Sequence, residues 1–79
     1  MSAQLQVTFK SVFDGAADYT VWNRATRTET RVRVSADGSV SRYPLGLPLQ
    51  ADEHNAVADF HNERAIRPAL RFGEQVGAR

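Results

Sequence analysis

The chain has 79 residues, a formal net charge of +1 and no cysteine. This length allows one domain with one small core, and the lack of cysteine excludes disulfide bonds and thiolate metal sites. Two histidines alone do not complete a structural zinc site, and no apolar run approaches the roughly 18 residues that span a bilayer. The first residues also lack the features of a secretory signal. We therefore expect one domain over residues 1–79 in the cytoplasm, with no metal and no cofactor.

Apolar and polar residues alternate near the N-terminus. The alternation over Leu5–Phe9 predicts a half-buried strand, residues 4–12. The adjacent apolar pair Val12-Phe13 breaks this period and indicates a bulge or an edge at the end of the strand. Asp14-Gly15 predicts a turn, with Ala16-Ala17 extending the loop.

The next two segments predict a hairpin with one apolar and one charged face. Its strands cover residues 19–24 and 29–35, joined by a loop over Ala25–Thr28. Antiparallel pairing across that loop places apolar pairs on one side, namely Val21 with Val32 and Tyr19 with Val34. The other side then pairs Arg24 with Glu29, Trp22 with Arg31 and Thr20 with Arg33. A shift of one residue would move every side chain of a strand to the opposite face of the sheet. Because both faces are consistent in this pairing, we favour it over a pairing shifted by one residue.

Asp37-Gly38 is the strongest hairpin signal in the chain. A two-residue loop would pair Val34 with Ser41 and leave Val40 on the polar face. A three-residue loop that starts at Ala36, with a left-handed Gly38, instead pairs Val34 with Val40 and keeps both in the core. We favour the longer loop, although it places Arg42 opposite Val32.

The rest of the chain predicts a connector, a helix and a segment of uncertain type. Pro44–Leu49 is expected to be an extended apolar connector, either a packed crossover, which we favour, or a docking motif. Asp52 is the expected N-cap of a helix over residues 52–65. Ala56, Val57 and Phe60 form its buried stripe. Residues 66–73 fit a strand or, slightly better, a short helix that starts at Pro68. The predicted fold is α+β: a four-stranded antiparallel β-meander with one main helix packed on one face, and a short C-terminal helix or strand.

The titratable residues do not indicate an enzyme. His54 and His61 are seven residues apart, which on a helix is about 10 Å and too far for one metal ion. His61 and Glu63 do not face each other at a spacing of two. The five glycines are isolated, so no phosphate-binding loop is present. We interpret the histidines as part of a solvated helix face.

The charged face of the predicted sheet is the better candidate for a function. It presents Lys10, Trp22, Arg24, Arg31 and Arg33, with Glu29 among them and Arg27 at the neighbouring turn. An exposed tryptophan among arginines is typical of a protein-binding surface. The same residues suit single-stranded nucleic acid, through base stacking and phosphate contacts, but the nearly neutral net charge makes this the second choice. A merely solvated face, with the Arg31 stem covering Trp22, is the remaining interpretation.

In overall character the chain resembles small phage-encoded anti-CRISPR proteins, in particular inhibitors of type I-C surveillance complexes. The features are its short length, its lack of cysteine, the arginine-rich meander TVWNRATRTETRVRV and the helix HNAVADFHNERAIR. The resemblance implies a stoichiometric inhibitor that binds a Cas subunit, such as a Cascade backbone subunit, and blocks recruitment of target DNA. It also implies no catalysis, no cofactor and a location in the host cytoplasm. Because the chain is not strongly acidic, the implied mechanism is occlusion rather than DNA mimicry.

An outer strand of the predicted sheet would leave backbone groups unpaired. Such an edge on the first or fourth strand would allow pairing with a second copy. We therefore expect a monomer or a weak homodimer.

Overall fold

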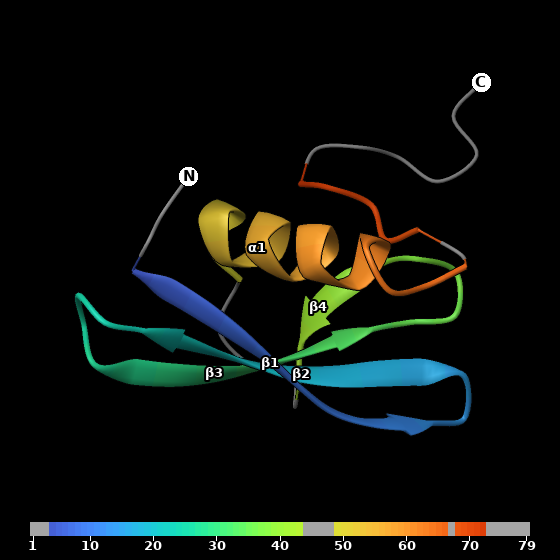
Figure 1. The fold of residues 1–79 in the computed structure, drawn as a ribbon, viewed down its shortest axis with the longest axis horizontal. Helices are drawn as coiled ribbons and strands as arrows, with labels where there is room; N and C mark the ends of the chain where they lie inside the picture. The colour runs from blue at the N-terminus through green and yellow to red at the C-terminus, as the bar shows by residue number, and fades with distance from the viewer. Residues whose placement is uncertain (1–3, 44–48, 67, 73–79) are drawn as a thin grey trace.

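The computed structural model describes residues 4–43, 49–66 and 68–72. Four antiparallel strands form one sheet in the order β1 (Leu5–Phe13), β2 (Ala16–Asn23), β3 (Thr28–Val34) and β4 (Val40–Arg42). Helix α1 (Ala51–Asn62) lies across one face of this sheet (Figure 1). The predicted α+β meander with a helix on one face is therefore confirmed. No helix in the described part of the chain has the length and apolarity needed to cross a membrane.

β1 and β2 form a hairpin with a two-residue turn. Asp14 and Gly15 have φ angles of 55° and 81°, and two consecutive left-handed residues match the right-handed twist of the flanking strands. Phe13 pairs directly with Ala16, so Ala16-Ala17 begin β2 and do not extend the loop as predicted. The irregularity in β1 lies between Phe9 and Ser11, earlier than the sequence indicated, and leaves Lys10 as the extra residue of a bulge.

The register between β2 and β3 differs from the prediction by two residues. Tyr19 pairs with Val32 and Trp22 pairs with Glu29. The shift arises because the four-residue turn starts at Arg24, one residue earlier than predicted. Since the error is an even number of residues, every side chain keeps its predicted face although its partner changes.

The hairpin between β3 and β4 matches the predicted longer loop. Val34 pairs with Val40, the Ser35 N–H donates to Ser39 O at 2.8 Å, and Gly38 is left-handed with φ of 93°. A Cβ at Gly38 would lie only 2.8 Å from the backbone oxygen of Pro68. Glycine is therefore required both by the backbone angle and by the close approach of the C-terminal segment.

Helix α1 is shorter than predicted and begins earlier. Its N-cap is Gln50, whose side chain makes no capping hydrogen bond. Asp52, the predicted N-cap, lies inside the first turn, where its Oδ1 accepts from the N–H of Glu53 at 2.9 Å. A carboxylate in this turn still interacts favourably with the positive end of the helix. The helix ends at Asn62, because the chain closes into a tight turn in which the Arg64 N–H donates to His61 O at 2.9 Å.

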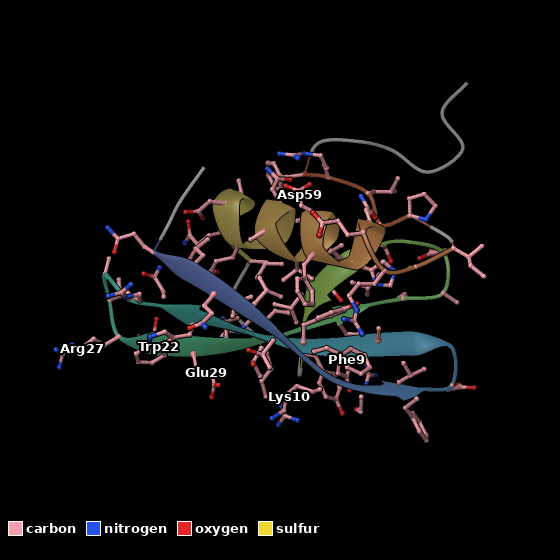
Figure 2. All side chains as sticks on the ribbon, in the orientation of Figure 1. Phe9, Lys10, Trp22, Arg27, Glu29 and Asp59 are labelled. Carbon is pink, nitrogen blue, oxygen red and sulfur yellow. The ribbon has the colours of Figure 1, made fainter. Side chains whose placement is uncertain are left out.

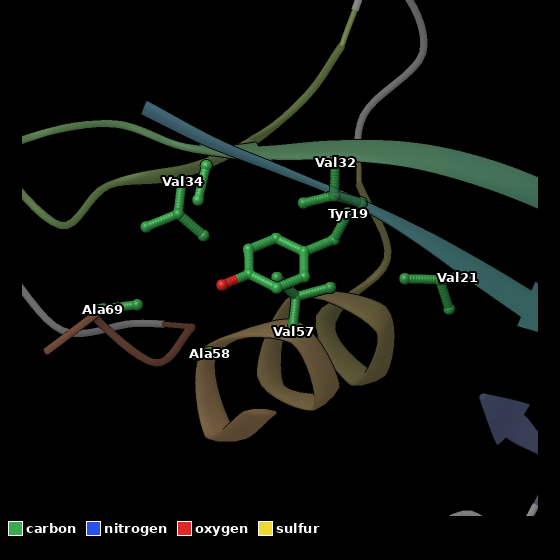
Figure 3. Packing of buried hydrophobic residues seen from close by; sticks show 8 residues of the cluster. Tyr19, Val21, Val32, Val34, Val57, Ala58 and Ala69 are labelled. Atoms are coloured by element: carbon green, nitrogen blue, oxygen red, sulfur yellow. The ribbon is translucent and has the colours of Figure 1, made fainter. Parts of the chain in front are cut away.

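The core lies between the sheet and α1 (Figure 3). Val21, Val32 and Val57 are completely buried, and Tyr19 is only 2% exposed. The Tyr19 ring meets Phe60 edge-on with 5.8 Å between centroids. The core uses the predicted apolar residues of β2 and β3, and from α1 it uses the predicted Val57 and Phe60 with Ala58 in place of the predicted Ala56. Ala69 joins them from beyond the helix.

The C-terminal segment, residues 68–72, is neither the predicted helix nor the alternative strand. Its backbone is held by side chains of α1: Asn62 Oδ1 accepts from the N–H of Ala69, and Asn55 Oδ1 accepts from that of Phe72. These side-chain partners replace the hydrogen bonds of a helix or a strand. Predicted residues Arg67 and Gly73, and most of the connector at residues 44–48, lie outside the described residues.

Candidate interaction face

Both histidines take structural roles at the edges of the core. His54 Nε2 donates to Leu70 O at 2.8 Å, and His61 Nδ1 shares a hydrogen bond of 2.6 Å with the hydroxyl of Tyr19. The predicted solvated helix face is therefore wrong for these two side chains. Among the described residues, no group of three His, Asp or Glu side chains is arranged to hold a metal ion.

The opposite side of the sheet, which we call the outer face, is not covered by any described helix or strand (Figure 1). Figure 2 shows Lys10, Trp22 and Glu29 on the side away from α1, with Asp59 on the helix side. The outer face comprises the side chains that alternate with the core residues, together with the β2–β3 turn. Its main members are Lys10, Phe13, Asp18, Thr20, Trp22, Arg24, Arg27, Glu29, Arg31, Arg33 and Tyr43.

All six predicted site residues lie on the outer face, but in different pairs from those predicted. Trp22 lies between Gln6 and Glu29, whereas Arg31 lies opposite Thr20. Arg31 is therefore a diagonal neighbour of Trp22 and not its direct partner. The remaining four are placed by the bulge of β1 (Lys10), by β3 (Arg33) and by the β2–β3 turn (Arg24, Arg27).

One end of the outer face is held together by contacts within the protein. Arg33 Nε donates to Asp18 Oδ1 at 2.8 Å, and its guanidinium carbon lies 3.8 Å from the centre of the Tyr43 ring. The hydrogen bond with Asp18 raises the pKa of Arg33. Arg31 approaches the same ring at 5.9 Å. Arg33 is thus engaged within the sheet, although the sequence predicted it as a binding residue.

Tyr43 was missed as a member of this face. Its N–H donates to Arg31 O at 2.9 Å, which continues the β3–β4 pairing by one residue beyond Arg42. The predicted register was sufficient to place Tyr43 on this face, because a strand that pairs Arg42 with Val32 places Tyr43 opposite Arg31.

The other end of the outer face is open. Trp22 is 38% exposed and lines a shallow hollow of about 390 Å³ together with Arg24 and Arg27. Among the described residues neither guanidinium has an ion pair. This end therefore combines an accessible indole with two arginines that no other described side chain neutralises.

The β2–β3 turn that carries both arginines is internally braced. Asn23 Oδ1 accepts from the N–H groups of Ala25 at 2.9 Å and Thr26 at 3.3 Å. The Arg24 N–H donates to Gln4 O at 2.8 Å, and Arg27 adopts a left-handed backbone with φ of 57°. The backbone positions of both arginines are thus fixed by the turn, while their guanidinium groups extend from it.

Charge is distributed unevenly between the two sides of the molecule. On the outer face, five cations accompany two carboxylates: Lys10, Arg24, Arg27, Arg31 and Arg33 with Asp18 and Glu29. The described residues of the helix side carry four carboxylates and three cations: Asp52, Glu53, Asp59 and Glu63 with Arg42, Arg64 and Arg71. The net charge of +1 therefore conceals a positive outer face beside a nearly balanced helix side, a difference that can orient an approaching charged partner.

Phe13 is a further exposed residue that the sequence did not mark as part of the site. It is 70% exposed and pairs with Ala16, so it lies at the far end of the outer face from Trp22. Trp22 is six positions after Ala16 along β2, which corresponds to about 20 Å. The break in alternation at Val12-Phe13 was the available signal for this exposed position.

A second hollow lies on the helix side, between the start of α1 and the β2–β3 turn. It has a volume of about 830 Å³, and its lining includes Arg42, Glu53 and Thr30. Arg42 lies opposite Val32 as predicted, but its half-buried side chain faces this hollow. The hollow is separate from the predicted site because the sheet lies between them.

Comparisons of the chain with protein-family models, with curated proteins and with solved structures find no match.

Proposed function

We propose that the protein is a non-enzymatic interaction module that binds a protein partner through its outer face. The observation that carries this proposal is the exposed Trp22 beside Arg24 and Arg27, on a face that no described element covers. Tryptophan and arginine are the residues most often found to dominate the binding energy of protein interfaces. The positive excess on this face adds a preference for an acidic partner surface.

The two edges of the sheet support binding through a face rather than by strand addition. β1 is an outer strand, but its bulge carries Lys10, and β4 has only three residues. A bulge, an edge lysine and a short edge strand each hinder pairing with another chain. We therefore favour a monomer over the weak homodimer.

A small module for single-stranded nucleic acid is the second candidate, favoured by the concentration of arginines on one face. Two features weaken it. Arg33 lies over the Tyr43 ring at 3.8 Å, so that side of the ring is not open to a base. The two other aromatic residues, Trp22 and Phe13, lie at opposite ends of the face, much farther apart than successive bases.

The resemblance to anti-CRISPR proteins adds a specific partner to this proposal. The outer face would bind a Cas subunit of a type I-C surveillance complex, such as its backbone subunit, in the host cytoplasm. One copy would occlude the surface that recruits target DNA. This role needs tight and stoichiometric contact but no chemistry, in keeping with a site made of an indole and guanidinium groups.

The test is binding of the purified protein to a purified type I-C surveillance complex. A combined Trp22→Ala, Arg31→Ala, Arg33→Ala variant should bind at least 100-fold more weakly, since it removes the exposed indole together with two guanidinium groups of β3 from the outer face. The matched control replaces Asp59 and Arg71, an exposed ion pair on the helix side, with alanine and should bind normally.

Two outcomes would contradict the proposal. Normal binding by the triple variant, with its circular dichroism unchanged, would exclude the outer face as the interface. Absence of any complex with the wild-type protein would exclude the Cas partner. A gel-shift series with oligothymidylate tests the second candidate: binding that falls steeply with salt would support it.

A further inference from the structure

We infer that the hollow formed by Trp22, Arg24 and Arg27 is a subsite for a carboxylate side chain of the partner, with an adjacent apolar residue covering the indole. This inference rests on the proposed function and names the chemistry of one part of the interface. It also assigns carboxylate binding to a smaller set of residues than the sequence predicted, namely the two arginines of the β2–β3 turn and not the two arginines of β3.

The first argument is the contrast in how the arginines of the outer face are occupied. Arg33 is bound to Asp18 and stacked on Tyr43, so its charge is already compensated. Arg24 and Arg27 have no ion pair or side-chain hydrogen bond among the described residues. Their donors are available to an incoming anion without breaking an existing contact.

The second argument is the backbone of the turn. Arg27 is a non-glycine residue with φ of 57°, a conformation that is uncommon for residues with a side chain. Glycine would adopt it more easily. Strained positions of this kind occur preferentially at binding sites, and here the left-handed residue directs a guanidinium from the same turn that carries Arg24.

The third argument is the match between the hollow and its proposed occupant. Guanidinium groups bind carboxylates in a planar, two-pronged geometry, and the indole offers an apolar surface beside them. Glu29 pairs with Trp22 in the neighbouring strand and adds a negative charge next to the hollow. A singly charged carboxylate tolerates that neighbour better than the continuous negative charge of a nucleic-acid backbone.

The hollow can be observed directly, because Trp22 is the only tryptophan in the chain. Its fluorescence should report occupancy of this site alone. The probe is a short capped peptide in which glutamates flank one phenylalanine, titrated at low salt. The reference probes are the same peptide with glutamines and an oligothymidylate of equal charge.

We expect the glutamate peptide to change the Trp22 emission in a saturable manner, and the glutamine peptide to have little effect. The variant Arg24→Gln, Arg27→Gln should weaken binding by about tenfold, since two charge-assisted contacts are lost from an exposed site. Arg71→Gln, which removes an arginine from the helix side, should change the affinity by less than about twofold.

Three results would overturn the assignment: equal binding of the two peptides, wild-type affinity in the Arg24→Gln, Arg27→Gln variant, or tighter binding of oligothymidylate. The last would transfer the site to nucleic acid. These failures are distinguishable from failure of the proposed function. A partner complex that weakens with Trp22→Ala, Arg31→Ala, Arg33→Ala but not with Arg24→Gln, Arg27→Gln would keep the interface and reject the subsite.

Discussion

The two faces of the sheet use neighbouring residues of the same strands in opposite ways. On β3, Val32 is completely buried while Arg31, the preceding residue, is exposed. On β2, Tyr19 and Val21 contact the core while Trp22 remains 38% exposed. The covered face is closed by α1 and by residues 68–72, whereas no element in the described part of the chain covers the outer face (Figure 1).

This difference assigns stability and binding to separate sets of side chains. Burial of apolar area favours folding by about 25 cal/mol per Å², and this term arises mainly on the covered face. Side chains on the outer face can change with little loss of folding energy, so they can be chosen for a partner. Single substitutions on the two faces test whether stability and binding depend on separate sets of side chains.

The largest effect is expected where the cover is attached to the sheet. Gly38→Ala places a Cβ 2.8 Å from the Pro68 oxygen and forces alanine to a φ of 93°. The steric and backbone penalties together should lower the free energy of unfolding by about 3 kcal/mol. Gly15→Ala is the matched control, since among the described residues its Cβ would meet only Ala36 Cβ, at 3.6 Å, and it should cost about 1 kcal/mol. If urea denaturation gave the same loss in the free energy of unfolding for both variants, the close approach of Pro68 to Gly38 would not contribute to the effect.

A direct comparison of the two faces uses adjacent residues of β3. Val32→Ala removes two methyl groups from a completely buried site and should destabilise the protein by about 2 kcal/mol. Arg31→Ala should change stability by less than about 0.5 kcal/mol, because its side chain is exposed. Chemical denaturation of both variants measures the difference. Similar losses would mean that the outer face contributes to folding as much as the covered face does.

A smaller effect is expected at the boundary of the core, where Tyr19 meets His61. Tyr19→Phe removes the hydroxyl that shares a hydrogen bond with His61 Nδ1 and should cost about 1 kcal/mol. Burial raises the pKa of Tyr19 above its ordinary value of 10.0, and Arg64 partly opposes the shift.

The raised pKa of Tyr19 also predicts a pH dependence. Well below pH 10 the tyrosine is protonated in the folded and unfolded states, so its contribution to stability is constant. As the pH rises above about 10, the unfolded state loses the proton first, and the free energy of unfolding falls until the folded state also titrates. Urea denaturation at increasing pH should show this fall in the wild type and a weaker one in Tyr19→Phe. If the free energy of unfolding had the same pH dependence in both proteins, the raised pKa of Tyr19 in the folded state would be contradicted.

A small expected gain in stability separates folding from binding within the outer face. Arg27→Gly relieves the left-handed backbone at φ of 57° and should stabilise the protein by about 0.5 kcal/mol, after the entropy cost of glycine is subtracted. The same variant should bind the glutamate peptide more weakly. A variant that is more stable and also binds with full affinity would show that the Arg27 side chain has no role in the hollow.

Several features of the fold could be predicted from local sequence because they depend on near neighbours. Alternation over β2 and β3 defined the core-facing residues Tyr19, Val21, Val32 and Val34. The three-residue loop ending at Gly38 followed from the need to keep Val40 with Val34 on the apolar side. The same alternation placed Trp22, Arg31 and Arg33 on one face, which is the part of the site that the sequence specified. Lys10, Arg24 and Arg27 reach this face through the bulge of β1 and the β2–β3 turn.

The pairing partners could not be predicted, because they depend on where a turn begins. Asn23 ends β2 and accepts two backbone hydrogen bonds from the turn, which moves the register by two residues. The predicted Trp22–Arg31 pair therefore became Trp22–Glu29 and Thr20–Arg31. Asp18, counted as part of no site, became the partner of Arg33.

The repeated His-Asn pairs show the same limit in the helix. Their spacing placed them on one side of α1, but their roles depend on a segment distant in sequence. Asn62 and Asn55 hold the backbone of residues 68–72, and His54 contacts Leu70 O. Local periodicity contains no information on these contacts, and so it favoured a helix or a strand where the chain is irregular.

The sequence by itself determined which residues are apolar on one side of each strand, and therefore that a sheet would be covered on one face and charged on the other. This follows because side-chain direction in a strand alternates with a period of two, whatever the partner strand. Only the tertiary structure decided which arginines are engaged and which remain available. That outcome depends on register, on turn geometry and on the approach of Asp18 and Tyr43, which arise from residues brought together by folding.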